Sequence, residues 1–323
     1  MDFNLPITYQ IAGSSTINLN SIAASEVTTS SPLSGYKVLS ATFGDVTMTG
    51  YVDKRALHDG VDAGDTYLGT KTLSIVCGVF GSSIADFHDR VQALLDASRP
   101  VPREYQDDYG FRNLAFSQAT IDTTNFTSGY IPMQMKVRPV SIPAVQLSSA
   151  QSIGVSSKGF ATNVQLNFVA RKPYKFRQDS RAITISASSA TTSFPNLGSA
   201  IVYPTFEIIF STASTYSSAT ITSVTFTFDG SSLKLNSLDF PAKTASSEVR
   251  WYLDFDTQTV YRGVRSTAGG AYVKSLRQDV IDTTTYLFGS IPPTDDSTTS
   301  MTTTYTGASI PAQILVAYTE AWY

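Results

Sequence analysis

The sequence predicts a mainly β protein with one embedded α-helix, in which a β-rich domain precedes an antiparallel β-sandwich. Charged residues make up only 15% of the chain, well below the usual quarter, and the Ser, Thr and Tyr that replace them suit strands. The hydrophobic pattern has a period of two along most of the chain and a helical period in one stretch. Beyond residue 199, short strand-like runs recur at regular spacing, which is typical of a sandwich.

The N-terminal third predicts an arm followed by strands. The length of 323 residues suggests two domains of ordinary size. Residues 1–35 are polar and weakly periodic, so we expect an N-terminal arm with at most a short strand at 7–11. Residues 36–52 predict two strands separated by a hairpin turn at Gly44-Asp45. Residues 53–69 are rich in Asp and Gly and predict a loop.

The stretch 68–100 changes period halfway along. Its first half alternates as a strand, and its second half has apolar residues at helical spacing. These apolar residues are Ile84, Phe87, Val91, Leu94 and Leu95. Ser83 is the predicted N-cap, Asp86 suits the first turn, and Pro100 stops the helix. We therefore predict a helix over 83–98.

The remaining pattern divides the chain into two domains. Alternation predicts strands over 130–140 and 163–171, and the Ser/Thr-rich stretch 186–199 predicts a linker or boundary. We therefore place the first β domain at 36–185 and the second at 186–323. Strand-like runs in the second domain lie at 200–211, 219–228, 231–239, 248–256, 258–264, 272–277 and 309–319.

Composition argues against several classes of function. The net charge of −3 gives no global attraction to nucleic acid or acidic membranes. One cysteine, Cys77, provides neither a disulfide framework nor a thiolate metal cluster. Its alternation with apolar residues predicts a buried, inert thiol. We expect no signal peptide, and no membrane span because no apolar run approaches the ~18 residues that one needs.

Residues that could support catalysis are few. The two histidines, His58 and His88, lie in a predicted loop and beside the apolar face of the predicted helix, and no serine stands in a nucleophile-elbow motif. The aspartates within 59–65 lack the ordered spacing and distal glutamate of a helix-loop-helix calcium site. Asp254 and Asp256 are better explained by a strand and its turn than by paired catalytic carboxylates. We predict no enzymatic activity, no metal site and no cofactor.

Several short motifs stand in order along the chain. The strand Gly69–Ile75 contains Lys71 and leads into the predicted helix. The strand end Ala170–Tyr174 closes the first domain. In the second domain, Asn196–Gly198 opens the sandwich and Leu253–Thr257 forms part of a hairpin. In this order the motifs resemble the distal tail protein of siphophages, a component of the baseplate hub.

The resemblance covers residues 36–320 with two departures. Lys71 stands where the family commonly has arginine, and Lys172 stands where its closing strand commonly has aspartate. The resemblance implies a β-barrel-like, ring-forming first domain and a galectin-like second domain. It also implies a homo-hexamer at the distal end of the virion tail, made in the host cytoplasm. The expected partners are the tail-tube protein, the tail-tip hub protein and peripheral receptor-binding proteins, with DNA passing through the lumen without sequence-specific binding and no membrane insertion.

Under this interpretation the notable residues are structural. We expect Phe87, Val91 and Leu94 to brace a ring-building sheet, and Lys71 and Trp251 to serve structure as well. A cluster of basic and aromatic residues over 171–181 predicts a domain junction or subunit contact rather than nucleic-acid binding.

Two alternatives stay open. The first is a host-glycan-binding module of the tail tip, with Tyr252 and Tyr261 as candidate contacts, because aromatic faces stack on sugars. The His-x-Asn-Pro-Arg run of galectins is missing from the sequence. The second is a tail-tube protein, against which the extra domain after residue 185 argues.

Overall fold

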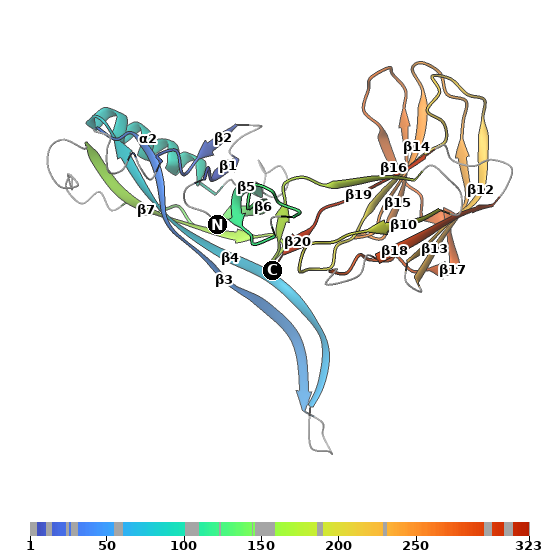
Figure 1. The fold of residues 1–323 in the computed structure, drawn as a ribbon, viewed down its shortest axis with the longest axis horizontal. Coiled ribbons are helices and arrows are strands. Elements are labelled where there is room, and N and C mark those ends of the chain that lie inside the picture. The colour runs from blue at the N-terminus through green and yellow to red at the C-terminus, as the bar shows by residue number, and fades with distance from the viewer. Residues whose placement is uncertain are drawn as a thin grey trace. The chain divides into compact units, whose positions relative to one another are not determined.

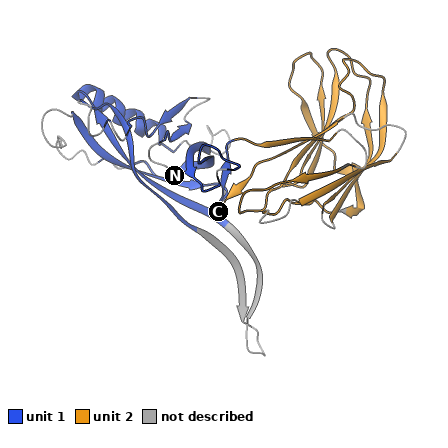
Figure 2. Cartoon of the chain, in the orientation of Figure 1, with its two compact units in different colours: residues 1–178 blue, residues 179–323 orange. Residues whose placement is uncertain are grey.

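The structure is a computed structural model, and it confirms a mainly β fold with antiparallel sheets, in which Ile84–Ala97 is the one α-helix whose bounds lie within the described residues. The chain forms two compact units, residues 1–178 and 179–323 (Figure 2). Among the residues that the structure describes, no helix is long and apolar enough to cross a bilayer. The structure describes residues 5–10, 15–23, 26, 32–54, 61–100, 110–122, 124–143, 145, 159–185, 190–228, 231–293, 299–306 and 313–322.

Unit 1 is built on one antiparallel sheet with strand order β2-β1-β5-β6-β7-β4-β3 (Figure 1). The described pairings leave β2 and β3 at the two ends of this order, so they do not close a barrel. A short strand, β8, also pairs with β6. The strands are β1 Thr8–Gln10, β2 Thr16–Asn18, β3 Gly35–Lys54, β4 Val61–Gly81, β5 Arg112–Ala119, β6 Tyr130–Pro139, β7 Phe160–Ala170 and β8 Lys175–Arg177.

The predicted turn at Gly44-Asp45 is wrong, because β3 runs through it. The pairing of β3 with β4 shifts register between Phe43 and Val46, so the Gly-Asp pair forms a bulge inside one strand. A Cβ atom at Gly44 would lie 2.2 Å from Thr72 Oγ1. Glycine is therefore required here by the close approach of β4 and not by a chain reversal.

The loop predicted over 53–69 is also largely wrong. Residues 53 and 54 are the last two residues of β3, and β4 starts at Val61. Residues 55–60 lie outside the described residues. Pairing continues as far as Lys54 with Val61. Asp53, Asp62, Gly64, Asp65 and Gly69, which suggested a loop, are thus part of a long two-stranded ribbon.

The helix α2, Ile84–Ala97, confirms the predicted helix and its cap. The Ser83 Oγ accepts a hydrogen bond from the Asp86 N–H at 3.2 Å, as an N-cap side chain does. Its buried residues are Phe87, Val91, Leu94 and Ala97. Ile84 was expected among them but is 57% exposed, because it stands at the first helical position, where the packed face ends.

Unit 2 contains two antiparallel sheets, and it confirms the predicted sandwich. One sheet has the order β10-β18-β12-β13-β17 and the other β16-β15-β14-β11-β19-β9. Phe206 of β11 and Phe226 of β12 pack between the sheets with ring centroids 4.8 Å apart. The strands are β9 Arg181–Ile185, β10 Ala190–Phe194, β11 Thr205–Ile209, β12 Ala219–Phe228, β13 Ser231–Phe240, β14 Glu248–Asp254, β15 Thr259–Arg265, β16 Val273–Leu276, β17 Ile281–Tyr286, β18 Thr299–Thr306, β19 Gln313–Tyr318 and β20 Ala321–Trp322, with a 3-10 helix η3 at Gln278–Val280.

The stretch predicted as a linker, 186–199, is partly a strand. β10 occupies residues 190–194 and pairs with β18 along its whole length. Phe194 is fully buried, with its ring centroid 6.0 Å from that of Phe228. A Ser/Thr-rich composition therefore belongs here to a sheet edge rather than to a connection, because one buried aromatic residue is enough to anchor it.

Candidate functional site

The two tyrosines predicted as glycan contacts are cross-strand neighbours in unit 2. Tyr252 of β14 pairs directly with Tyr261 of β15, and both are half-buried. They alternate with the buried residues Trp251, Leu253 and Val260, so they lie on the side of the sheet that faces away from the core. We call this side the outer face, and its central residues are Glu207, Arg250, Tyr252, Asp254, Tyr261 and Lys274.

The outer face contains a shallow hollow of about 260 Å³, lined by both tyrosines together with Glu207, Asp254 and Lys274. Asp254 is engaged in the β14–β15 turn, because its Oδ1 accepts the N–H groups of Asp256 at 3.0 Å and of Thr257 at 3.3 Å. This places Asp256 in a turn, as the sequence indicated. Neither aspartate is arranged with a second carboxylate for acid–base chemistry in the described contacts.

The ring of Tyr252 is already covered. Lys274 Nζ lies over it, 4.0 Å from its centroid, and a Cβ atom at Gly263 would lie 2.5 Å from Tyr252 Cε2. Burial, and then the charge of Glu207, raise the pKa of the Tyr252 hydroxyl. A sugar that stacks on the Lys274 side of Tyr252 therefore has to displace a cation from its face.

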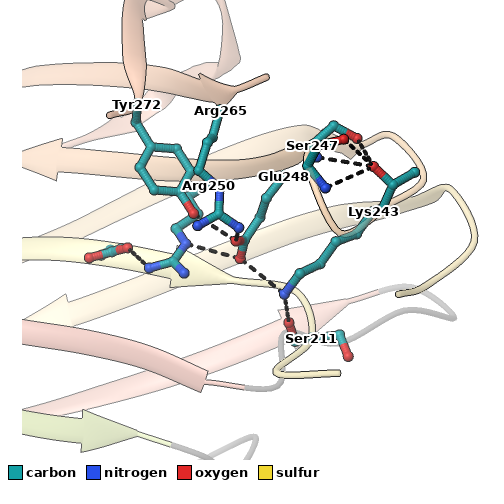
Figure 3. A network of polar contacts seen from close by, with 10 residues as sticks. Ser211, Lys243, Ser247, Glu248, Arg250, Arg265 and Tyr272 are labelled. Carbon is teal, nitrogen blue, oxygen red and sulfur yellow. Dashed lines mark hydrogen bonds and ion pairs between the residues drawn. The ribbon is translucent and has the colours of Figure 1, made fainter. Parts of the chain in front are cut away.

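A buried carboxylate, Glu248, organises one end of the outer face (Figure 3). Its Oε1 accepts from Arg250 Nε at 3.0 Å and from Lys243 Nζ at 3.3 Å. Its Oε2 accepts from Arg265 Nη2 and from the Tyr272 hydroxyl, both at 2.7 Å. Because the side chain is only 2% exposed, this network replaces water with protein donors on both oxygens.

The network stabilises the ionised form of Glu248. Burial acts to raise the pKa of Glu248, but the hydrogen bonds from Arg250 and Tyr272 outweigh it and hold the pKa below its usual range. Arg250 also donates to Glu207, and its guanidinium lies 4.9 Å from the centroid of Tyr272. At neutral pH Glu248 is therefore ionised, and the Tyr272 hydroxyl that donates to it keeps its proton, because burial and the hydrogen bond to Glu248 raise its pKa to about 12.

The sequence did not reveal this network. Its members come from β14, β15 and the segments before β14 and β16, so no local motif links them. The available signal was the presence of Glu248 and Arg250 at alternate positions of one strand, with Arg265 on the next. Alternation predicts a polar face, but burial of the carboxylate follows only from the pairing of the strands.

Trp251 lies on the opposite side of the same strand from the outer face. Its side chain is fully buried, and its Nε1–H donates to the Asp239 carbonyl of β13 at 3.1 Å. The indole therefore ties the two sheets of unit 2 together, and it is not available to a ligand.

Phe87, Val91 and Leu94 face the sheet of unit 1. The helix packs on β4 and β7, and the Phe87 and Phe160 ring centroids lie 6.3 Å apart. A Cβ atom at Gly81 would lie 2.4 Å from the Phe87 Cα, so glycine lets the helix backbone rest directly on the end of β4. Whether these residues brace a ring stays a prediction.

Lys71 is buried in β4 with 8% of its surface exposed. Its Nζ lies 5.9 Å from the centroid of Phe43, and Lys175 Nζ lies 5.6 Å from the same ring. Burial, and then the charge of Lys71, lower the pKa of Lys175. Lys71 and Lys175 thus share the Phe43 ring within the sheet of unit 1.

Residues capable of catalysis are not assembled in the part of the chain that the structure describes. Cys77 is a buried free thiol whose pKa is raised to about 12 by burial, and His88 is exposed on α2. Among the described residues there is no group of three His, Cys, Asp or Glu side chains that could hold a metal ion. His58 and Asp59 lie outside the described residues, as do the side chains of Asp62 and Asp65.

The second notable feature is the outer edge of β3 in unit 1. At its start this edge is covered, because Ile22 N–H donates to the Tyr36 carbonyl at 3.0 Å and Val38 N–H donates to Asn20 Oδ1 at 3.3 Å. From Leu39 onward β3 pairs with β4 alone among the described strands, and Leu39 is 49% exposed. β4 itself pairs with β7 only over Lys71–Gly81, so the two strands continue past the sheet as a ribbon.

Sequence comparison finds no family profile and no curated protein that matches this chain. Among solved structures, this chain is similar to the Dit protein of phage SPP1, which is described as a paradigm of the hub adsorption apparatus of phages infecting Gram-positive bacteria. The two structures superpose with a TM-score of 0.58 at 16% sequence identity. The match covers 98% of this chain and 99% of the SPP1 protein. A chain of the phage p2 baseplate in its activated conformation matches at a TM-score of 0.47 and 8% identity, covering 98% and 97%. Over nearly its full length, the chain therefore has the fold of the SPP1 Dit hub protein, which confirms the predicted resemblance to siphophage distal tail proteins at the level of the fold.

Proposed function

We propose that this chain is the distal tail protein of a siphophage-like virion. It forms a homo-hexameric ring at the distal end of the tail, joins the tail tube to the tail-tip baseplate and anchors peripheral or receptor-binding proteins. The observation that carries the proposal is the fold shared with the SPP1 hub protein across both units. The protein acts by assembly and not by catalysis, and it takes no cofactor. It is made in the host cytoplasm, and DNA passes through the lumen of its ring.

The edge of β3 supports the ring. An exposed strand edge is a template for pairing with another chain, and a closed ring removes such edges. Isolated two-stranded ribbons are also marginal in water without a further layer to pack against. The β3–β4 ribbon and the edge that begins at Leu39 are therefore the surfaces of unit 1 that we assign to contacts between subunits.

The outer face of unit 2 supports the anchoring of other proteins. Tyrosine and arginine are the side chains that protein interfaces favour, and here Tyr252, Tyr261, Tyr272 and Arg250 share one face. The Glu248 network holds that face rigid. A preorganised face loses little conformational entropy when a partner binds.

The test is the mass of the purified intact chain in solution, together with negative-stain images. We expect six copies in a ring with a central hole. Leu39→Lys places a charge on the edge of β3 and should reduce the ring population. Leu276→Lys on β16, where the leucine is 56% exposed, is the matched control and should leave the ring intact. A chain that stays monomeric both alone and with its tail-tube and tail-tip proteins would contradict the proposal.

A second candidate is the host-glycan-binding module, which is favoured by the hollow between Tyr252 and Tyr261. Binding of the intact chain to a glycan array, lost in Tyr261→Ala, would support it. Ring formation with no glycan signal would leave the scaffold function alone. The tail-tube alternative is disfavoured, because unit 2 adds a complete sandwich beyond the first sheet.

A further inference from the structure

A cavity of about 690 Å³ lies in unit 1, and none of its described lining residues belongs to β3 or to the outer face. Three arginines line it, and each comes from a different place in the chain: Arg99 after the end of α2, Arg112 at the start of β5 and Arg138 near the end of β6. Asp96 is the one carboxylate among the described lining residues. The fold thus gathers three guanidinium groups around one cavity.

Two of the arginines are held by the same neighbour. The Arg138 guanidinium lies 5.1 Å from the centroid of the Phe111 ring, and Arg112 Nη1 donates to the Phe111 carbonyl at 3.4 Å. Arg99 directly follows the helix cap, where the Ser98 Oγ–H donates to the Leu94 carbonyl at 2.6 Å. Ordering the Arg112 and Arg138 side chains in advance lowers the entropic cost of binding an anion.

The other described lining residues are apolar or carry no charge, and among them Gln10 and Ser15 are polar. Ala97, Pro139 and Val169 contribute apolar surface. Tyr9 also lines the cavity but is only 3% exposed. Burial, opposed by the charge of Arg112, raises the pKa of Tyr9 to about 12, so its phenol remains protonated at neutral pH. The cavity therefore combines positive charge with a small apolar floor.

We propose that this cavity binds an acidic segment of a partner protein. Its carboxylates pair with the guanidinium groups, which match a carboxylate in a two-pronged geometry. Its aliphatic side chains or methylene groups pack on the apolar floor. Single-stranded nucleic acid fits less well, because bases need exposed aromatic rings to stack on and the aromatic ring in the described lining, Tyr9, is almost fully buried. The site lies within unit 1 of a single chain, so it does not depend on ring formation.

The test is fluorescence anisotropy of the intact chain with a labelled ten-residue peptide that alternates glutamate and leucine. We expect saturable binding that weakens about tenfold in Arg138→Gln and further in the double variant Arg99→Gln/Arg138→Gln, since each removes a charge-assisted hydrogen-bonding group. Lys172→Gln removes the same charge from an exposed position of unit 1 that is not among the lining residues. It should bind within about twofold of the unaltered chain, as expected for a screened surface charge.

Three outcomes would overturn the proposal: equal weakening in Lys172→Gln, equal binding of a peptide with glutamine in place of glutamate, or tighter binding of oligothymidylate that the same arginine variants abolish. A second measurement needs no variant. Hydrogen exchange of the unaltered chain should slow at residues 93–100 and 137–140 when the acidic peptide is added. Slowing elsewhere without slowing there would also overturn the proposal, even if the glutamine variants failed to fold.

Discussion

Both units are built from antiparallel strands, but they arrange these strands differently. Unit 2 packs two sheets face to face, fills the space between them with aromatic side chains such as Phe206 and Phe226, and locks one face with the Glu248 network. Unit 1 has one sheet with a helix on it, and its longest strands continue beyond that sheet as a ribbon. A sandwich buries its own apolar faces, whereas a ribbon needs a partner. The difference indicates that unit 2 buries its own apolar faces, and it is consistent with our proposal that the ribbon of unit 1 makes contacts between subunits.

The largest effect is expected in the core beneath the helix. Phe87→Asp removes a buried ring and places a carboxylate against β4, which should destabilise unit 1 by ~4 kcal/mol or more and abolish folding or ring formation. Thermal unfolding followed by circular dichroism, with mass in solution, measures both. Ile84→Asp, on the same helix but 57% exposed, is the control and should change little. A soluble, ring-forming Phe87→Asp chain would contradict the bracing role.

The next largest effect on stability is expected in unit 2. The variant should still form rings of the same size as those of the unaltered chain. Glu248→Ala leaves Lys243, Arg250 and Arg265 without their shared anion, and breaking such a buried cluster costs ~3–5 kcal/mol. The control is Asp279→Ala, which removes an exposed ion pair with Arg277 and should cost at most ~1 kcal/mol. Similar unfolding midpoints for the two variants would show that burial does not strengthen the Glu248 network.

The same carboxylate predicts how stability depends on pH. The pKa of Glu248 is lower in the folded chain than its usual value, so the folded state favours the ionised form. Its contribution is present above the ordinary glutamate pKa of ~4.3 and is lost as pH falls through the folded value. Unfolding midpoints measured from pH 7 down to pH 3 should fall more steeply for the unaltered chain than for Glu248→Gln. Parallel curves would remove Glu248 as a cause of acid sensitivity.

Local signals predicted α2 well and the β3–β4 ribbon poorly. The helix is specified by its own cap, Ser83, and by the spacing of Phe87, Val91 and Leu94, which all lie within residues 83–94. Gly44 and Asp45 look the same in sequence whether they form a turn or a bulge, and only the pairing of β3 with β4 on both sides of them decides between the two. Non-local pairing is information that local periodicity does not carry.

The same reasoning separates the predicted sites from the missed ones. Tyr252 and Tyr261 could be grouped from the sequence because a hairpin joins their strands, and alternation then fixes which side of the sheet they share. Arg99, Arg112 and Arg138 could not, since their proximity depends on where α2 ends relative to β5 and β6. Residues brought together by a short turn are predictable, whereas residues brought together by the order of strands in a sheet are not.

The smallest effects on stability are expected around Tyr252, on the outer face of unit 2. Lys274→Ala removes a cation that lies 4.0 Å from the Tyr252 centroid, which should cost only ~0.5–1 kcal/mol because the site is partly exposed. Gly263→Ala should cost more, ~1–3 kcal/mol, since its Cβ would press on the same ring. Denaturant midpoints of the two variants test this order. If glycans bind the hollow through Tyr252, Lys274→Ala should also strengthen binding on the array, because it uncovers a stacking surface that the lysine occupies in the folded chain.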